Sequence, residues 1–149
     1  MYPVPMTMQT FAVLLVAGMA GARLGLAIVV TWLTQAALGL PFLADGAGGP
    51  EAFSGPTAGY LGGFAIAAFV CGWLTEQPQL RGWAAMLAVF LFGHALILAF
   101  GWARLSMLIG AAPAFDSGVG PFVIGAVLKS VLAVAVVKLA EPRIRALQS

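Results

Sequence analysis

The sequence predicts an all-α fold, an integral membrane helical bundle that forms one domain over residues 1–149. Three measures of composition lead to this fold class: 62% of the residues are hydrophobic, 8% are charged, and the mean hydropathy is +1.03. These values lie far outside the proportions of apolar and charged residues in an ordinary globular domain. A soluble chain of this size buries only about 70% of its surface, so it could not hide so many apolar side chains from water.

The apolar residues fall into runs long enough to cross a membrane, which takes about 20 mostly apolar residues per helix. Charged and Gly/Pro-rich breaks divide the chain into five such spans. The spans cover residues 6–22, 24–40, 57–74, 83–102 and 120–140. Each should be a helix, because the lipid core holds no water to hydrogen-bond the N–H and C=O groups of a backbone that is not helical.

The connectors predict the orientation of the chain. "GARLG" and "TEQPQLRG" are short, whereas "PFLADGAGGPEAFSGP" and "ARLSMLIGAAPAFDSG" are long. Basic residues near span ends mark the cytoplasmic side. One side holds Arg23, Arg81, Lys138, Arg143 and Arg145, and the other holds Arg104. We therefore expect a multi-pass protein of the cytoplasmic (inner) cell membrane, with a cytoplasmic C-terminus and with the long loops and the N-terminus outside.

Several classes of function are excluded by what the sequence lacks. It has no P-loop, no metal-spaced histidines and no nucleophile–base pair. The lone cysteine, Cys71, lies in an apolar run, which predicts neither a disulfide nor a metal site. The net charge of +2 is small and dispersed, so no nucleic-acid partner is expected. We expect no catalytic residue, no metal, no bound cofactor and, from "MYPVPMTMQT", no removable signal peptide.

Lys129 lies near the middle of the last span, where a charged side chain costs about 2.5–3.5 kcal/mol on insertion scales. Small residues on the same helical face, among them Gly125, Ala126 and Ala133, leave room beside the ammonium. The lysine could snorkel outward or pair with a loop acid such as Asp116. Alternatively, it binds an anionic or hydrogen-bonding group of a buried ligand.

The stretch "SGPTAGYLGGFAIAAFVCG" begins with a Gly-Pro corner and becomes an apolar helix. Pro56 suits the first turn of a helix, and Ser54 and Gly55 form the turn before it. Thr57 and Tyr60 place two hydroxyls and an aromatic face at the outer mouth. Small residues recur every four positions at Gly55, Gly59, Gly63, Ala67 and Cys71. This stripe is typical of close helix packing in membranes.

Other polar residues within the spans have two interpretations. Thr31, Thr34 and Gln35 share one face of the second span, and His94 lies near the centre of the fourth. Hydrogen bonds between helices are their default role. The polar residues of "VPMTMQT", which are Thr7, Gln9 and Thr10, could line a site or cap the first helix.

Four motifs in order, "VPMTMQT", "GLPFLADGAGG", "GPTAGYLGGF" and "GVGPFVIGAVLK", resemble the BioY family, the biotin-binding S components of energy-coupling factor (ECF) transporters. The resemblance covers residues 4–139. It implies a six-helix bundle that captures biotin from outside, under loops that act as lids, for uptake into the cytoplasm. It also implies a transmembrane T component and ABC-type ATPases as partners, with ATP used by those partners alone. Carried over by motif, the substrate-binding residues are Ser54, Gly55, Pro56, Thr57, Tyr60 and Lys129.

The chain departs from the family pattern in two places. The family has an acid one turn before the final lysine, where this chain has Ala126. Lys129 could find its counter-charge in the ligand carboxylate or in Asp45, Glu51 or Asp116. The family also has an apolar helix before the first motif, and we expect that this helix is missing here or that the start of the chain is misassigned.

Biotin needs hydrogen bonds for its ureido ring, an apolar wall for its fused rings and a cation or donor for its carboxylate. Residues of each kind occur near the outer face. They are Ser54, Thr57, Tyr60 and Gln35 for hydrogen bonds, Phe42, Phe53, Phe64, Phe122 and the tryptophans for the wall, and Lys129 for the charge. Another small vitamin would satisfy the same needs, so biotin rests on the resemblance. A stand-alone membrane transporter and a membrane scaffold are the alternatives.

Overall fold

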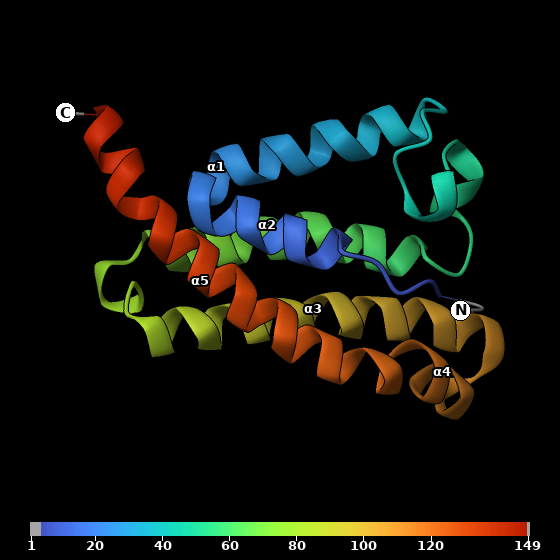
Figure 1. Ribbon diagram of the computed structural model, residues 1–149. Helices are drawn as coiled ribbons and strands as arrows, with labels where there is room; N and C mark the ends of the chain where they lie inside the picture. Colours follow the sequence, from blue (N-terminus) through green and yellow to red (C-terminus); the bar gives the residue numbers. More distant parts are fainter. Residues whose placement is uncertain (1–3, 149) are drawn as a thin grey trace.

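The computed structural model describes residues 4–148, which form a bundle of helices with no strand in that range (Figure 1). The α-helices are α1 (Gln9–Ala37), α2 (Ala58–Glu76), α3 (Trp83–Ile109), α4 (Ala111–Gly118) and α5 (Val123–Gln148). Short 3₁₀ turns connect them: η1 (Ala44–Gly46), η2 (Pro50–Phe53), η3 (Pro78–Leu80) and η4 (Gly120–Phe122). Within the described residues, four helical segments are long and apolar enough to cross a membrane. The all-α membrane fold is thereby confirmed.

The first two predicted spans lie within α1, which doubles back on itself at Gly21 (Figure 1). The backbone of Gly21 has φ +80° and ψ −176°, a conformation that a residue with a Cβ rarely adopts. The backbone N–H of Ala22 donates to the Glu76 carboxylate, 2.9 Å away. Gly72 packs directly on this turn, because a Cβ there would lie 2.6 Å from the carbonyl carbon of Gly21. The turn therefore joins residues 9–20 and 22–37 as two antiparallel arms.

The second long connector is not the loop that the sequence predicts. The helix α3 continues past Trp102 to Ile109, and after Gly110 the chain forms α4. The apolar run "LSMLI" lets the helix continue, and Gly110 with φ +91° provides the break. The indole N–H of Trp102 donates to the Ala111 carbonyl, 3.0 Å away, which holds α4 against α3.

Two further boundaries differ from the prediction. The second arm of α1 ends at Ala37 instead of residue 40, and α5 extends to Gln148 instead of residue 140. Pro142 lies inside α5. The apolar run of this span ends near residue 140, but the charged extension that follows remains helical to Gln148.

The small-residue stripe of α2 packs against α3, which confirms the packing interpretation for most of its members. A Cβ at Gly63 would lie 3.0 Å from the Cα of Ile97. Ala67 and Cys71 are fully buried, and the Cys71 thiol donates to the Val89 carbonyl at 3.5 Å. Gly55, by contrast, lies before the helix and meets no neighbouring helix. Close backbone contact thus brings α2 between α1 and α3.

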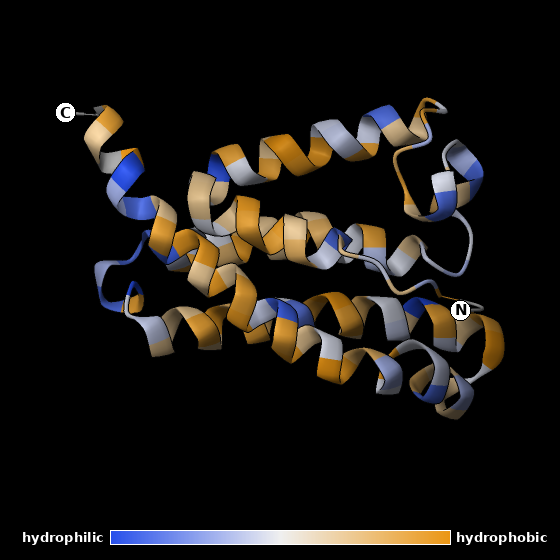
Figure 2. Cartoon of the chain, in the orientation of Figure 1, coloured by the Kyte–Doolittle hydropathy of each residue, from blue (hydrophilic) through white to orange (hydrophobic). Residues whose placement is uncertain are grey.

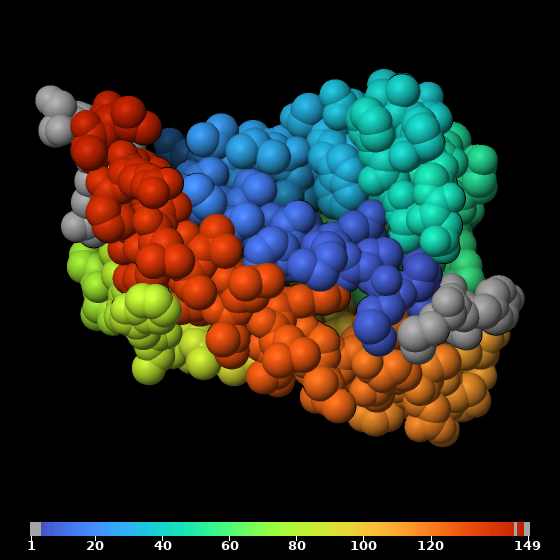
Figure 3. All heavy atoms as spheres, in the orientation of Figure 1, coloured from blue at the N-terminus to red at the C-terminus, as the bar shows by residue number. Residues whose placement is uncertain are grey.

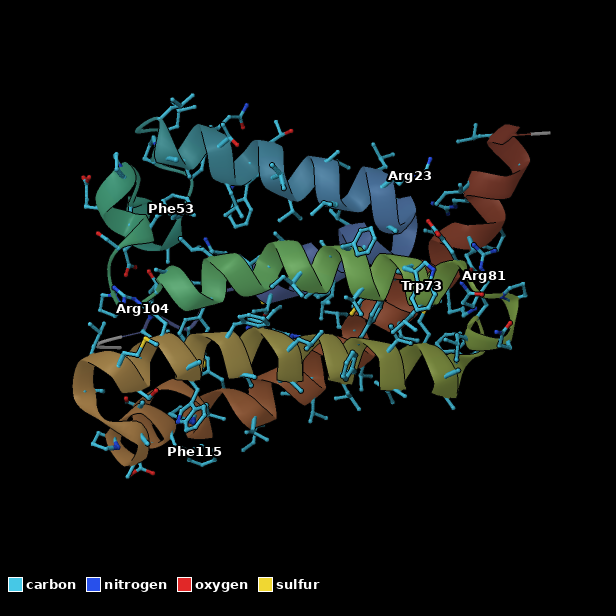
Figure 4. All side chains as sticks on the ribbon, turned by 180° about the vertical axis from the view of Figure 1, so that it is seen from behind. Arg23, Phe53, Trp73, Arg81, Arg104 and Phe115 are labelled. Carbon is cyan, nitrogen blue, oxygen red and sulfur yellow. The ribbon has the colours of Figure 1, made fainter. Side chains whose placement is uncertain are left out.

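The basic residues are divided unevenly between the two ends of the bundle. Arg23 and Arg81 lie toward one end, whereas Arg104 lies toward the other (Figure 4). Lys138 also belongs to the Arg81 end, because its ammonium donates to the Arg81 carbonyl and pairs with Glu141 at 3.3 Å. The side chain of Arg145 lies outside the described part of the chain. Hydrophobic residues dominate the helices between these ends (Figure 2), as expected for a bundle surrounded by lipid.

Candidate functional site

A cavity of about 340 Å³ lies at the end of the bundle that carries the two long connectors. At this end the N-terminal segment lies between the η1–η2 connector and the α4 region (Figure 3). The lining residues come from the N-terminal segment, the start of α1, the η1–η2 connector, α2, α3 and η4. They are Val4, Pro5, Thr7, Gln9, Leu43, Ala44, Asp45, Ala47, Ala52, Pro56, Thr57, Tyr60, Leu61, Phe64, Leu98 and Phe122. The cavity is mostly apolar with a few polar groups, which is typical of small-molecule sites.

Three of the six predicted binding residues line the cavity: Pro56, Thr57 and Tyr60. They follow η2 and form the entry to α2, as the Gly-Pro corner predicted. The amides of Ser54 and Gly55 both donate to the Glu51 carbonyl at 3.2 Å, which closes the turn before the helix. Ser54 and Gly55 are not lining residues and shape the loop instead. The Ser54 carbonyl accepts a hydrogen bond from Arg104, which attaches this loop to α3.

The ring of Tyr60 forms part of the cavity wall, while its hydroxyl is hydrogen-bonded within the protein. The hydroxyl donates to the Gly118 carbonyl at 2.7 Å, and the side chain is only 6% exposed. The ring lies directly on the backbone of Gly101, where any Cβ would overlap it. The position of Tyr60 therefore depends on glycines in α3 and α4.

Lys129 lies behind the wall of the cavity and is not a lining residue. Its ammonium donates to the Thr7 carbonyl and to the Thr10 hydroxyl, the latter at 3.4 Å. It forms no ion pair with Asp45, Glu51 or Asp116 within residues 4–148. Because Thr7 is itself a lining residue, Lys129 connects α5 to the N-terminal segment that closes the site. The proposed pairing with a loop acid is wrong, and snorkelling toward the lipid is not observed.

Phe64 forms part of the cavity wall and is backed by a second aromatic ring outside the wall. Phe64 is a lining residue and stacks on Trp32, with ring centroids 5.8 Å apart and an interplanar angle of 25°. The indole N–H of Trp32 donates to the Phe42 carbonyl at 3.2 Å, which attaches the second arm of α1 to the outer connector. Of the other wall candidates, Phe122 lines the cavity, whereas Phe42, Phe53 and the tryptophans do not.

The threonines of the second span do not make the hydrogen bonds between helices that the sequence analysis expected. The hydroxyls of Thr31 and Thr34 each donate to the carbonyl four residues earlier in the same helix, at 2.7 Å. Gln35 is exposed and does not line the cavity. His94, by contrast, does join two helices, because its Nδ1 lies 2.9 Å from the Ser130 hydroxyl on α5.

Three polar lining residues were absent from the predicted binding set: Thr7, Gln9 and Asp45. The Thr7 hydroxyl donates to Gln9 Oε1 at 3.3 Å and accepts the Gln9 amide at 3.4 Å. The lining interpretation of this motif therefore applies to Thr7 and Gln9, whereas the N-cap residue of α1 is Met8 and no side chain caps the helix. The sequence signal for Asp45 is its place in a glycine-rich outer loop, although the sequence alone predicts it only as a counter-charge for Lys129.

Comparisons with known proteins agree with this architecture. The model of the BioY family matches residues 1–146. A biotin transporter BioY of Thermotoga maritima is 38% identical over 132 residues, covering 88% of this chain and 77% of that protein. One from Rhizobium etli is 36% identical over 140 residues, covering 88% and 74%. The solved S-component for biotin from an ECF-type ABC transporter superimposes with a TM-score of 0.87 at 27% identity, over 95% of this chain and 78% of that one.

Proposed function

This chain belongs to the BioY family, and we propose that it is a substrate-binding S component that captures biotin from the extracytoplasmic side for transport into the cytoplasm. Its relatives are named as transporters, so the expectation of a protein without enzymatic activity is confirmed. A single domain spanning the chain performs the capture.

The observation that carries the proposal is the cavity at the end of the bundle with the long connectors. Its volume of about 340 Å³ lies at the lower end of the range for small-ligand pockets, about 300–1,000 Å³. The ring of Phe64, which stacks on Trp32 behind it, and the ring of Tyr60 supply flat apolar surfaces for the fused rings of biotin. Thr57 and Gln9 supply hydrogen-bonding groups beside them.

The six binding residues carried over from the motifs act in three ways in this proposal. Pro56, Thr57 and Tyr60 contact the ligand directly, as their place in the cavity wall supports. Ser54 and Gly55 give the loop before α2 its shape. Lys129 acts through the position of Thr7, and its charge attracts the carboxylate of biotin toward α5.

The remaining parts of the proposal concern the membrane and the partners. The chain lies in the inner (cytoplasmic) cell membrane. The end with Arg23, Arg81 and Lys138 faces the cytoplasm, because basic residues near span ends mark the cytoplasmic side. The C-terminus lies on the same side. A transmembrane T component and ABC-type ATPases complete the transporter, and ATP is used by the ATPases alone. The ECF-type assembly of the solved relative supports this arrangement.

Binding to the purified chain in detergent tests the proposal. Isothermal titration with biotin, riboflavin and thiamine should give saturable binding for biotin alone. Biotin at 100 times its Kd should also stabilise the folded state by about 2.7 kcal/mol, which raises the Tm. The absence of biotin binding, or equal binding of all three vitamins, would overturn the assignment. Uptake by vesicles that hold this chain without an ATPase would instead identify a stand-alone transporter.

A further inference from the structure

Asp45 is the one charged side chain among the cavity-lining residues that the structure describes. It lies on η1, in the connector between α1 and α2. Lys129, the charged group of the site that the sequence predicts, lies behind the wall instead. The charge that a ligand meets on entering the cavity is therefore negative.

Two other polar side chains of the cavity already have protein partners. Gln9 Oε1 accepts from Thr7, and the Tyr60 hydroxyl donates to Gly118. The carboxylate of Asp45 makes no hydrogen bond or ion pair with any residue in the described range 4–148, and the side chain is exposed. Both of its oxygens are thus free to accept hydrogen bonds from a ligand.

The turn that holds Asp45 is fixed by its backbone. The Leu43 amide donates to Ala47 at 3.0 Å, the Gly46 amide to Leu43 at 3.2 Å, and the Ala47 amide to Ala44 at 3.1 Å. Leu43 is buried beneath the turn. Asp45 has φ +57°, and among the described residues no other non-glycine residue has a positive φ. A residue held in this region without a structural bond from its side chain is a candidate for function.

We propose that Asp45 determines specificity by accepting hydrogen bonds from the N–H groups of the ligand, which for biotin are those of the ureido ring. This inference rests on the proposed biotin function. It fixes the orientation of the ligand, because like charges repel and the biotin carboxylate must therefore lie away from Asp45. The aromatic rings of Phe64 and Tyr60 then face the fused rings of the ligand.

Ligand analogues paired with variants test the inference. The variants Asp45→Asn and Asp45→Gly remove the charge, and both new residues tolerate the left-handed backbone, so the turn is retained. Asp116→Asn is the matched control, because Asp116 is an exposed acid of α4 that does not line the cavity. The ligands are biotin, biotinamide, which lacks the terminal carboxylate charge, and 2-iminobiotin, whose cationic guanidine replaces the ureido group.

We expect Asp45→Asn and Asp45→Gly to weaken biotin and biotinamide equally, by about tenfold, since charge-assisted hydrogen bonds are the stronger kind. The loss for 2-iminobiotin should be larger by about another tenfold, because a cation–carboxylate pair is lost. Asp116→Asn should change none of the three affinities by more than about twofold.

Two results would overturn the inference while leaving the biotin function in place. One is wild-type affinity of the Asp45 variants for all three ligands. The other is tighter biotin binding by those variants without a change for biotinamide, which would place Asp45 beside the carboxylate of biotin. Failure of the wild-type chain to bind biotin would instead reject the proposed function itself, so the two failures are distinguishable.

Discussion

The hydroxyl of Tyr60 donates a hydrogen bond to the carbonyl oxygen of Gly118, 2.7 Å away, and thereby joins α2 to the end of α4. Tyr60→Phe should lower the stability of the chain by about 1–2 kcal/mol, because a buried carbonyl loses its donor. Biotin affinity should change less than about threefold, since the ring remains in place. Tyr60→Leu should weaken biotin binding at least about tenfold, or 1.4 kcal/mol. Thermal unfolding and isothermal titration in detergent measure the two effects, and a large loss of affinity in Tyr60→Phe would show that the hydroxyl contacts the ligand.

Lys129 offers a second test, because its ammonium connects α5 to the N-terminal segment. Lys129→Met should weaken biotin binding at least about tenfold, as the segment around Thr7 loses its attachment and the site loses its nearby positive charge. Lys138→Met is the control on the same helix, since its ion pair with Glu141 lies at the opposite end of the bundle. That variant should bind biotin normally. Equal affinities for the two variants would remove Lys129 from the site.

Gly101 should tolerate no side chain, because a Cβ there would overlap the ring of Tyr60. Gly101→Ala should destabilise the chain by about 1–3 kcal/mol through overpacking and displace Tyr60 from the cavity wall. Gly62→Ala is the matched control, since a Cβ at Gly62 meets nothing within 4 Å. We expect that variant to retain the Tm or to gain stability slightly, because alanine favours a helix. A Gly101→Ala chain as stable as Gly62→Ala would contradict the close contact with Tyr60.

Glu76 caps the second arm of α1 by accepting the Ala22 amide. Glu76→Ala should cost about 0.5–2 kcal/mol, the usual range for loss of an N-terminal cap. Glu76→Gln keeps an acceptor oxygen and should lose less. Biotin affinity should be unchanged in both, because Glu76 ends α2 far along the chain from the lining residues at its start. Unfolding curves of the two variants against wild type measure the difference, and identical curves for all three would show that the cap contributes nothing.

Much of the helical plan could be predicted from the sequence, because lipid forces the backbone into helices and charged residues mark their ends. The connector after Trp102 was predicted wrongly because its glycine, proline and charged residues resemble a loop. In the structure they form about two more turns of α3 and the short helix α4, which lies against α3. Local composition could not reveal that packing.

For the site, the sequence by itself determined the Gly-Pro corner and the places of Pro56, Thr57 and Tyr60 at the start of α2, since turn chemistry and helix periodicity are local. Only the tertiary structure decided that Lys129 contacts Thr7 from behind the wall and that Asp45 lines the cavity. Both facts depend on contacts between segments far apart in the chain. The direction of a long side chain depends on the neighbours that tertiary packing places around it. The position of the residue within a span does not specify those neighbours.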